Sequence, residues 1–273
     1  MKKDFHLSIL FIVIICFYGL NGCNKSDSTV TKTSVSATPL TLFVHCAAGM
    51  RKPVEKMAVE FQNRTGYVIE FSYAGTNTLL GQIKVTEKGD VYIAGDADYI
   101  EMAKEEFLIE RDEILCYFVP VIMVKKGNPN QIKSLNDLLR EGIRIGQADE
   151  KAAAIGRLTP EIVAMNGISQ KDWNTHVRLS TGTVNELGIA IELGTLDAAI
   201  VWSSIAINYI EKAEMIIIPR SKNIIPKVGA AVLSFSEHKK EAGELLSFLV
   251  SDYSKRILEN EGYVVDLENL EQF

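Results

Sequence analysis

Four cysteines are the residues of this 273-residue chain with the most distinctive chemistry, and one of them has a defined context. Cys23 follows Leu20-Asn21-Gly22, at the end of an apolar run that begins at Leu7 and is preceded by Lys2 and Lys3. A positive segment, a short apolar segment and a small residue before the cleavage site are typical of an export signal. The last four residues resemble the bacterial lipobox. This pattern predicts a signal peptide over residues 1–22 and a diacylglyceryl group on the sulfur of Cys23.

Two other interpretations of this N-terminal segment stay open. It could be a signal peptide without lipidation or a short anchor, although the apolar run is shorter than the ~20 residues of a membrane-spanning helix. Residues 23–39 are polar and rich in Ser and Thr, which predicts a flexible tether. We therefore expect an exported, membrane-anchored lipoprotein with a periplasmic or cell-surface location.

The other cysteines give no sign of metal or redox chemistry. Cys16 would leave with the signal peptide, and Cys46 and Cys116 are not part of a CxxC motif or of a zinc-type spacing with histidine. We expect both to be small buried apolar residues. A disulfide between them is the alternative, because exported proteins can hold one.

Sequence motifs of common enzymes and of nucleic-acid binding are missing. The chain has no GxSxG, P-loop, GxGxxG or HExxH motif. Its formal net charge of −6 disfavours nucleic-acid binding, which needs clustered Lys and Arg. We expect no enzyme activity, no catalytic residue, no cofactor and no nucleic-acid partner.

The folded body shows alternating strand and helix patterns, which predict an α/β fold. Apolar periodicity and turn residues mark strands and apolar runs at 40–44, 68–73, 91–94, 116–124, 143–145, 177–179, 198–202, 215–218 and 228–233. Helical patterns start at Pro53, surround residues 79–83, and cover 99–107, 134–140, 153–166, 184–193 and two stretches before residue 262. The initial βαβαβα order predicts a parallel sheet with helices on both faces. Pro160 predicts a kink or a restart in its helix.

Five segments in collinear order carry a resemblance to a known family. They are LFVHCAAGM at 42–50, FSYAGTNTLLGQI at 71–83, GDVYIAGD at 89–96, GTV at 182–184 and GTLDAAIVW at 194–202. Together they resemble the molybdate/tungstate-binding proteins of ABC importers, within the type 2 periplasmic-binding proteins. The resemblance implies two α/β lobes joined by two crossover strands, with the ligand cleft between them. Lobe 1 would comprise residues 40–118 plus 229–265, and lobe 2 residues 119–228.

The resemblance also implies which residues hold the ligand. At the matching positions these are Gly49 (or the amide of Met50), Thr76, Ala153, Val184 and Trp202. Family members commonly have serine in place of Gly49 and tyrosine in place of Trp202. Four of the positions lie just before predicted helices, where unpaired amides and the helix dipole favour an anion.

The implied function is a monomeric binding protein that delivers molybdate or tungstate to an ABC permease in the membrane. The metal of the oxyanion would be the only metal bound. The alternatives are a binding lipoprotein or sensor for another small anion, such as sulfate or a phosphonate, or for ferric iron.

Overall fold

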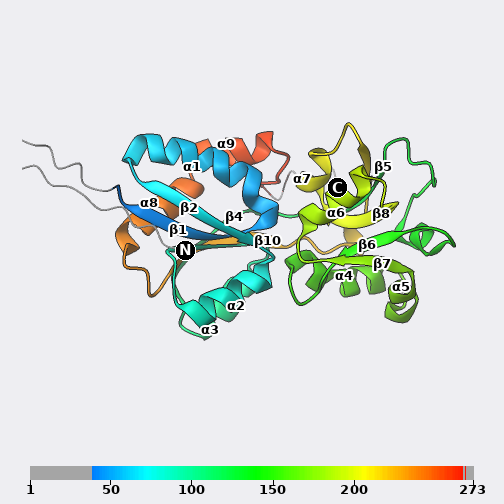
Figure 1. The fold of residues 1–273 in the computed structure, drawn as a ribbon, viewed down its shortest axis with the longest axis horizontal. Helices are drawn as coiled ribbons and strands as arrows, with labels where there is room; N and C mark the ends of the chain where they lie inside the picture. Colours follow the sequence, from blue (N-terminus) through cyan, green and yellow to red (C-terminus); the bar gives the residue numbers. More distant parts are fainter. Residues whose placement is uncertain (1–38, 267, 269–273) are drawn as a thin grey trace, which may run out of the picture. The chain divides into compact units, whose positions relative to one another are not determined.

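The computed structural model describes residues 39–266 and 268, and its strands form two five-stranded sheets (Figure 1). The predicted signal peptide, Cys23 and the tether up to residue 38 lie outside the described residues. We call the first sheet with its helices lobe 1, and the second sheet with its helices lobe 2. No helix of the described part is long and apolar enough to cross a membrane.

The sheet of lobe 1 has the order β2-β1-β3-β10-β4. Strands β1, β2 and β3 are parallel, whereas β10 runs antiparallel to both β3 and β4. The sheet is therefore mixed and not parallel as expected, because the chain returns from lobe 2 and inserts β10 between β3 and β4. The strands are β1 (Thr41–Ala47), β2 (Val68–Ala74), β3 (Val91–Ala94), β4 (Ile109–Tyr117) and β10 (Lys227–Leu233).

Helices cover both faces of this sheet. In Figure 1, α1 and α9 lie on one face and α2 and α3 on the other, while α8 packs against β10 and α9. The buried residues of α1 recur every three to four positions, as the apolar periodicity predicts. The helices are α1 (Arg51–Thr65), α2 (Thr76–Thr86), α3 (Asp98–Glu105), α8 (Lys239–Leu249) and α9 (Asp252–Asn260), and the 3-10 turn η1 (Ala48–Met50) precedes α1.

The sheet of lobe 2 has the order β7-β6-β8-β5-β9 and is also mixed. Strand β6 is parallel to β7 and β8, and β5 is antiparallel to β8 and β9. Helices α6 and α7 lie on one face, and α4 and α5 on the other (Figure 1). The strands are β5 (Pro120–Lys125), β6 (Ile145–Ala148), β7 (Val177–Thr181), β8 (Ala198–Trp202) and β9 (Ala213–Ile217). The helices are α4 (Ala154–Met165), α5 (Gln170–His176), α6 (Val184–Glu192) and α7 (Ser203–Ile207), with 3-10 turns η2 (Leu135–Leu139) and η3 (Arg220–Lys222).

Two local features differ from the expectations. The apolar run at 116–124 is not one element, because β4 ends at Tyr117 and β5 starts at Pro120, so that Phe118 and Val119 connect the two sheets. Helix α4 continues through Pro160 without restarting. Cys46 and Cys116 are buried free thiols, and burial raises the pKa of each.

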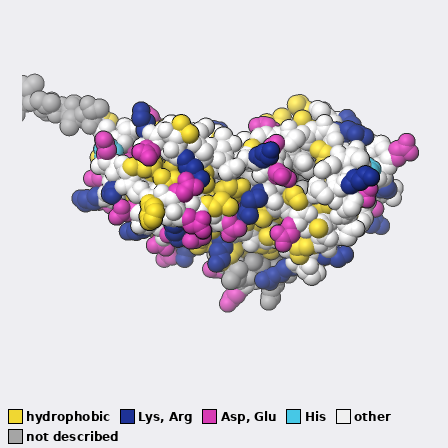
Figure 2. Space-filling view, turned by 90° about the horizontal axis from the view of Figure 1, so that it is seen from below, with side chains coloured by type: hydrophobic (Ala, Val, Ile, Leu, Met, Phe, Trp, Pro, Cys, Tyr) yellow, Lys and Arg dark blue, Asp and Glu magenta, His cyan; other side chains and the backbone are white. Residues whose placement is uncertain are grey.

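Charged side chains of both signs are interspersed on the face of the molecule in Figure 2. Some ion pairs join exposed residues, but Asp197 is buried and accepts hydrogen bonds from the Arg144 guanidinium at 2.8 Å. These hydrogen bonds hold the pKa of Asp197 well below its usual range. The pair fixes the loop that leads into β8, the strand that ends at Trp202.

Candidate functional site

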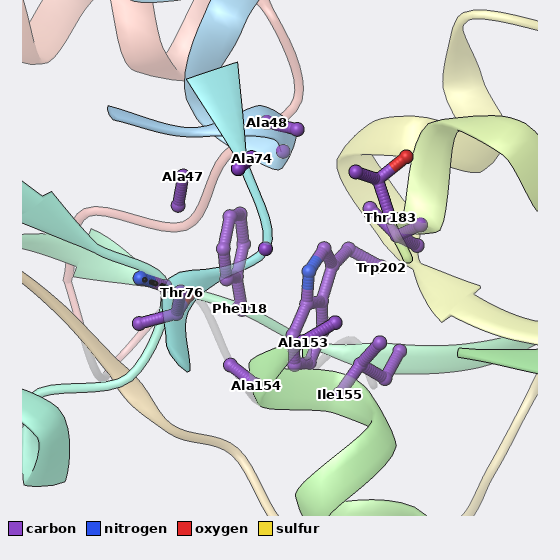
Figure 3. Close-up of a pocket in the computed structure, with 14 residues that line it drawn as sticks. Ala47, Ala48, Ala74, Thr76, Phe118, Ala153, Ala154, Ile155, Thr183 and Trp202 are labelled. Carbon is purple, nitrogen blue, oxygen red and sulfur yellow. Dashed lines mark hydrogen bonds between the residues drawn. The ribbon is translucent and has the colours of Figure 1, made fainter. Parts of the chain in front are cut away.

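A small cavity lies where β-strand ends and helix starts of the two lobes meet (Figure 3). Its volume is about 20 Å³, far below the ~300–1,000 Å³ of sites for drug-sized ligands. This closed arrangement therefore suits a compact ligand of a few atoms. The lining residues are Ala47, Ala48, Gly49, Ala74, Gly75, Thr76, Gly95, Phe118, Ala153, Ala154, Ile155, Thr183, Val184 and Trp202.

The structure brings together five of the six residues implied by the resemblance. Gly49, Thr76, Ala153, Val184 and Trp202 all line the cavity. Met50 does not line it, because its side chain is fully buried in the core of lobe 1.

Thr76 is the first residue of α2 and is fixed by two hydrogen bonds. The amide of Gly95 donates to Thr76 Oγ1 at 3.2 Å, and the Tyr92 hydroxyl donates to the Thr76 carbonyl at 2.9 Å. Because Oγ1 is the acceptor in this contact, its own proton is available for another acceptor. Thr76 can thus present a hydroxyl donor to a ligand in the cavity.

Trp202 ends β8 and forms one wall of the cavity. Its indole stacks on the ring of Phe118 with a centroid distance of 4.5 Å and an interplanar angle of 11°. Sequence reasoning missed Phe118 as a site residue. A usable signal was present, since Phe118 lies in the middle of the apolar run at which the chain has to cross between lobes.

The starts of α4 and α6 complete the lobe 2 side of the cavity. The Ala153 amide donates to the Asp149 carbonyl at 3.0 Å, so this amide is already engaged. Ala154 and Ile155 follow it in the first turn of α4 and also line the cavity. Val184 is the first residue of α6. First-turn amides have no intrahelical acceptor and lie at the positive end of the helix dipole.

Hydrogen bonds hold the two lobes together beside the cavity. The amides of Asn77 and Thr78, at the start of α2, donate to the Ala152 carbonyl at 3.0 and 3.4 Å. The Asn77 side-chain amide donates to the Lys151 carbonyl at 2.6 Å. We call these three bonds the latch. They occupy the amides of Asn77 and Thr78 in the first turn of α2. The amide and the hydroxyl group of Thr76 therefore remain available to a ligand.

The basic residues near the cavity are engaged in contacts with other groups. Arg157 of lobe 2 pairs with Asp96 and Asp98 of lobe 1. Lys52 of lobe 1 donates to Asn208 Oδ1 of lobe 2 at 2.7 Å. Among the described residues, none of those lining the cavity carries a charged side chain. The site therefore offers neutral donors, and the ion pairs hold the lobes around it.

A metal-binding cluster is not found in the described part of the chain. No group of three or more His, Cys, Asp or Glu side chains there could hold a metal ion. His45 is buried and lies outside the cavity lining, and its Nε2 atom is 2.8 Å from the Lys88 carbonyl. It is therefore a core histidine and not a ligand of the cavity.

Comparisons with known proteins identify relatives of this chain among binding proteins. The chain is 27% identical over 232 residues to a binding protein of Haemophilus influenzae, covering 85% of this chain and 94% of that protein. It is 22% identical over 247 residues to the molybdate-binding protein ModA of Mycobacterium bovis, covering 90% and 92%.

Two solved structures share the fold. One is the periplasmic molybdate-binding protein of Azotobacter vinelandii, with a TM-score of 0.73, 16% identity and coverage of 82% of this chain and 99% of that one. The other is the sulfate-binding protein SubI of Mycobacterium tuberculosis, with a TM-score of 0.75, 18% identity and coverage of 86% and 90%. The family model described as bacterial extracellular solute-binding protein matches residues 42–264. The chain therefore belongs to the bacterial extracellular solute-binding proteins, a family that binds solutes and does not catalyse reactions.

Proposed function

We propose that this protein binds a fully deprotonated tetrahedral oxyanion, molybdate or tungstate, in the cavity between its lobes. The observation that carries the proposal is the lining, which combines neutral donors with the starts of three helices, α2, α4 and α6, and has no charged side chain among the described residues. Several helix starts around one small cavity favour an anion without a buried cation. The similarity to ModA supports the choice of molybdate.

The donor set also bears on selectivity. Molybdate, tungstate and sulfate carry no proton near neutral pH, whereas hydrogen phosphate does. A protonated oxygen needs an acceptor, and among the side chains of the lining only the Thr76 and Thr183 hydroxyl groups can accept. Thr76 Oγ1 already accepts from the Gly95 amide, so the lining offers a ligand mainly donors. We therefore expect the site to reject phosphate.

Sulfate is the second candidate, because the sulfate-binding protein SubI has the same fold with a TM-score of 0.75. Ferric iron is disfavoured, since the cavity lining has no tyrosine or carboxylate and the described residues contain no group of three or more His, Cys, Asp or Glu that could hold a metal ion.

The proposal extends to the cell. The protein would be anchored through a lipid on Cys23, act as a monomer and deliver its ligand to the permease of an ABC transporter. Loss of membrane association in a Cys23→Ala variant would support the anchor, and unchanged membrane association would contradict it.

The ligand is tested by the melting temperature of the full-length protein with molybdate, tungstate, sulfate, phosphate or ferric citrate added singly. A ligand that binds the folded state stabilises it by RT ln(1 + [L]/Kd), which is about 2.7 kcal/mol at a concentration of 100 Kd. We expect large shifts with molybdate and tungstate, a smaller one with sulfate and none with phosphate. A shift with phosphate alone, or with none of the five, would contradict the proposal.

A further inference from the structure

Gly49 of lobe 1 and Trp202 of lobe 2 face each other at the cavity. A Cβ atom on Gly49 would lie 3.1 Å from Phe118 Cζ, 3.2 Å from Trp202 Cδ1 and 3.4 Å from Trp202 Nε1. Each distance is shorter than or at the limit of ordinary van der Waals contact, which begins near 3.4 Å. The indole edge therefore fits against Gly49 because this residue has no side chain.

The indole has little freedom to move away from that contact. It is 3% exposed and stacks on Phe118, which is 1% exposed. The Phe118 ring is confined in turn, because its other neighbours include the Tyr263 ring at a centroid distance of 5.8 Å. In close-packed groups, moving one ring also moves its neighbour. A side chain at position 49 would therefore have to shift both the Trp202 and the Phe118 ring.

Trp202 also supplies a hydrogen-bond donor at this wall. The indole Nε1–H can only donate, and Trp202 borders the cavity without a hydrogen-bond acceptor for this group among the described residues. The other tryptophan, Trp173, donates its Nε1–H to Gln147 Oε1 at 2.6 Å. In Figure 3 the indole nitrogen of Trp202 lies on the side of the ring that faces Phe118.

We propose that Gly49 and Trp202 form a matched pair that determines which oxyanion fits the cavity. The missing side chain at Gly49 leaves room for the indole edge, and the Nε1–H donates to an oxygen of the ligand. Together they fix the width of the cavity at the lobe junction. A larger residue at position 49 narrows the cavity and penalises a large oxyanion more than a small one. The identity of the ligand in this inference rests on the proposed function, whereas the contact between Gly49 and Trp202 does not.

The test uses Gly49→Ala, Trp202→Phe and the double variant, with Gly81→Ala as the matched control. Gly81 lies in α2 and a Cβ atom there would meet nothing within 4 Å. Titration calorimetry gives the Kd for molybdate and for the smaller sulfate ion. Phenylalanine keeps an aromatic ring on Phe118 but lacks the Nε1–H and the bulk beside Gly49.

We expect Gly49→Ala to raise the Kd for molybdate at least tenfold and the Kd for sulfate less. Trp202→Phe raises both Kd values at least fivefold, because the donor is lost. When Trp202→Phe is already present, Gly49→Ala adds less than threefold. Equal losses for both ions with Gly49→Ala, or additive effects in the double variant, would overturn the matched pair.

A ligand-free measurement separates this inference from the proposed function. If the wild-type protein binds neither ion, the proposed function is wrong. The pair is then judged from the melting temperatures, without ligand, of the wild type, the two single variants and the double variant. The matched pair requires the double variant to melt above the temperature expected from adding the two single shifts. Additive shifts would overturn it.

Discussion

Gly75 is the position at which one added methyl group tests whether closure of the lobes supports binding. Its φ of −65° and ψ of 149° are available to any residue, so alanine adds no backbone strain. A Cβ atom there would lie 2.3 Å from the Ala152 carbonyl oxygen and 2.7 Å from the Gly182 carbonyl oxygen, both in lobe 2. Ordinary contact begins near 3.4 Å. Lobe 2 would therefore have to withdraw by roughly 1 Å, since backbone carbonyls cannot rotate away like flexible side chains.

That withdrawal disrupts the three hydrogen bonds of the latch, whose present lengths are 2.6, 3.0 and 3.4 Å. At about 0.5–1.5 kcal/mol for each of the three bonds, the closed state loses roughly 1.5–4.5 kcal/mol. This loss corresponds to a rise in Kd of about 12- to 1,600-fold, at 1.4 kcal/mol for each tenfold change.

Titration calorimetry with molybdate measures the affinity, and small-angle scattering with and without ligand measures compaction. We expect Gly75→Ala to bind weakly and to compact less than the wild type, because hinge closure around the ligand is obstructed. Gly81→Ala, which lies within α2, is the control and should bind normally. If Gly75→Ala binds with an affinity within threefold of the wild type and compacts fully, closure of the lobes does not support binding.

Three further predictions concern other residues of the site and the core. Thr76→Val should weaken molybdate binding by about 1–3 kcal/mol, because the ligand and the Gly95 amide both lose a hydrogen-bond partner. Thr78→Val, at an exposed side chain, is the control and should leave the affinity unchanged. Equal affinities of Thr76→Val and the wild type in titration calorimetry would remove Thr76 from the site. Asn77→Ala should increase the rate of ligand dissociation about 2- to 12-fold in stopped-flow measurements, because one latch bond of about 0.5–1.5 kcal/mol is lost. An unchanged dissociation rate would exclude a role of the Asn77 side chain in lobe closure. Burial lowers the pKa of His45, so the unfolded chain takes up a proton near pH 6.5 before the folded protein does. The free energy of unfolding in urea should therefore be full above that pH and fall as the pH decreases through it. His45→Gln should reduce this fall in stability, and identical pH profiles of the variant and the wild type would contradict the role of His45.

The strand and helix patterns predicted most elements because the apolar period is strong where one side of an element is buried. Strands β3 (Val91–Ala94) and β8 (Ala198–Trp202) were predicted with their observed bounds. Residues 109–115 of β4 were missed because Glu110, Arg111, Asp112 and Glu113 hide its alternation. The strand forms because its backbone pairs with β10. Since β10 is distant in sequence, the local residue pattern does not reveal this pairing.

The site was harder to predict than the fold. Residues at helix starts could be proposed from the resemblance, but hydrogen bonding within the 149–153 turn decides that the Ala153 amide is engaged. The role of Gly49 depends on Trp202, 153 positions away in the sequence and in the other lobe, and on the Phe118 ring that stacks on it. Contacts between residues so far apart are set by tertiary packing, and sequence spacing alone does not show them.

The position of the bound ligand in a crystal shows whether the cavity is the oxyanion site. Crystals of the full-length protein grown with tungstate would be measured at an X-ray wavelength at which tungsten scatters anomalously. We expect one strong peak in the cavity, with ligand oxygens within hydrogen-bond distance of Thr76 Oγ1 and Trp202 Nε1. Crystals that bind tungstate only elsewhere, or not at all at concentrations that saturate a tight site, would contradict it.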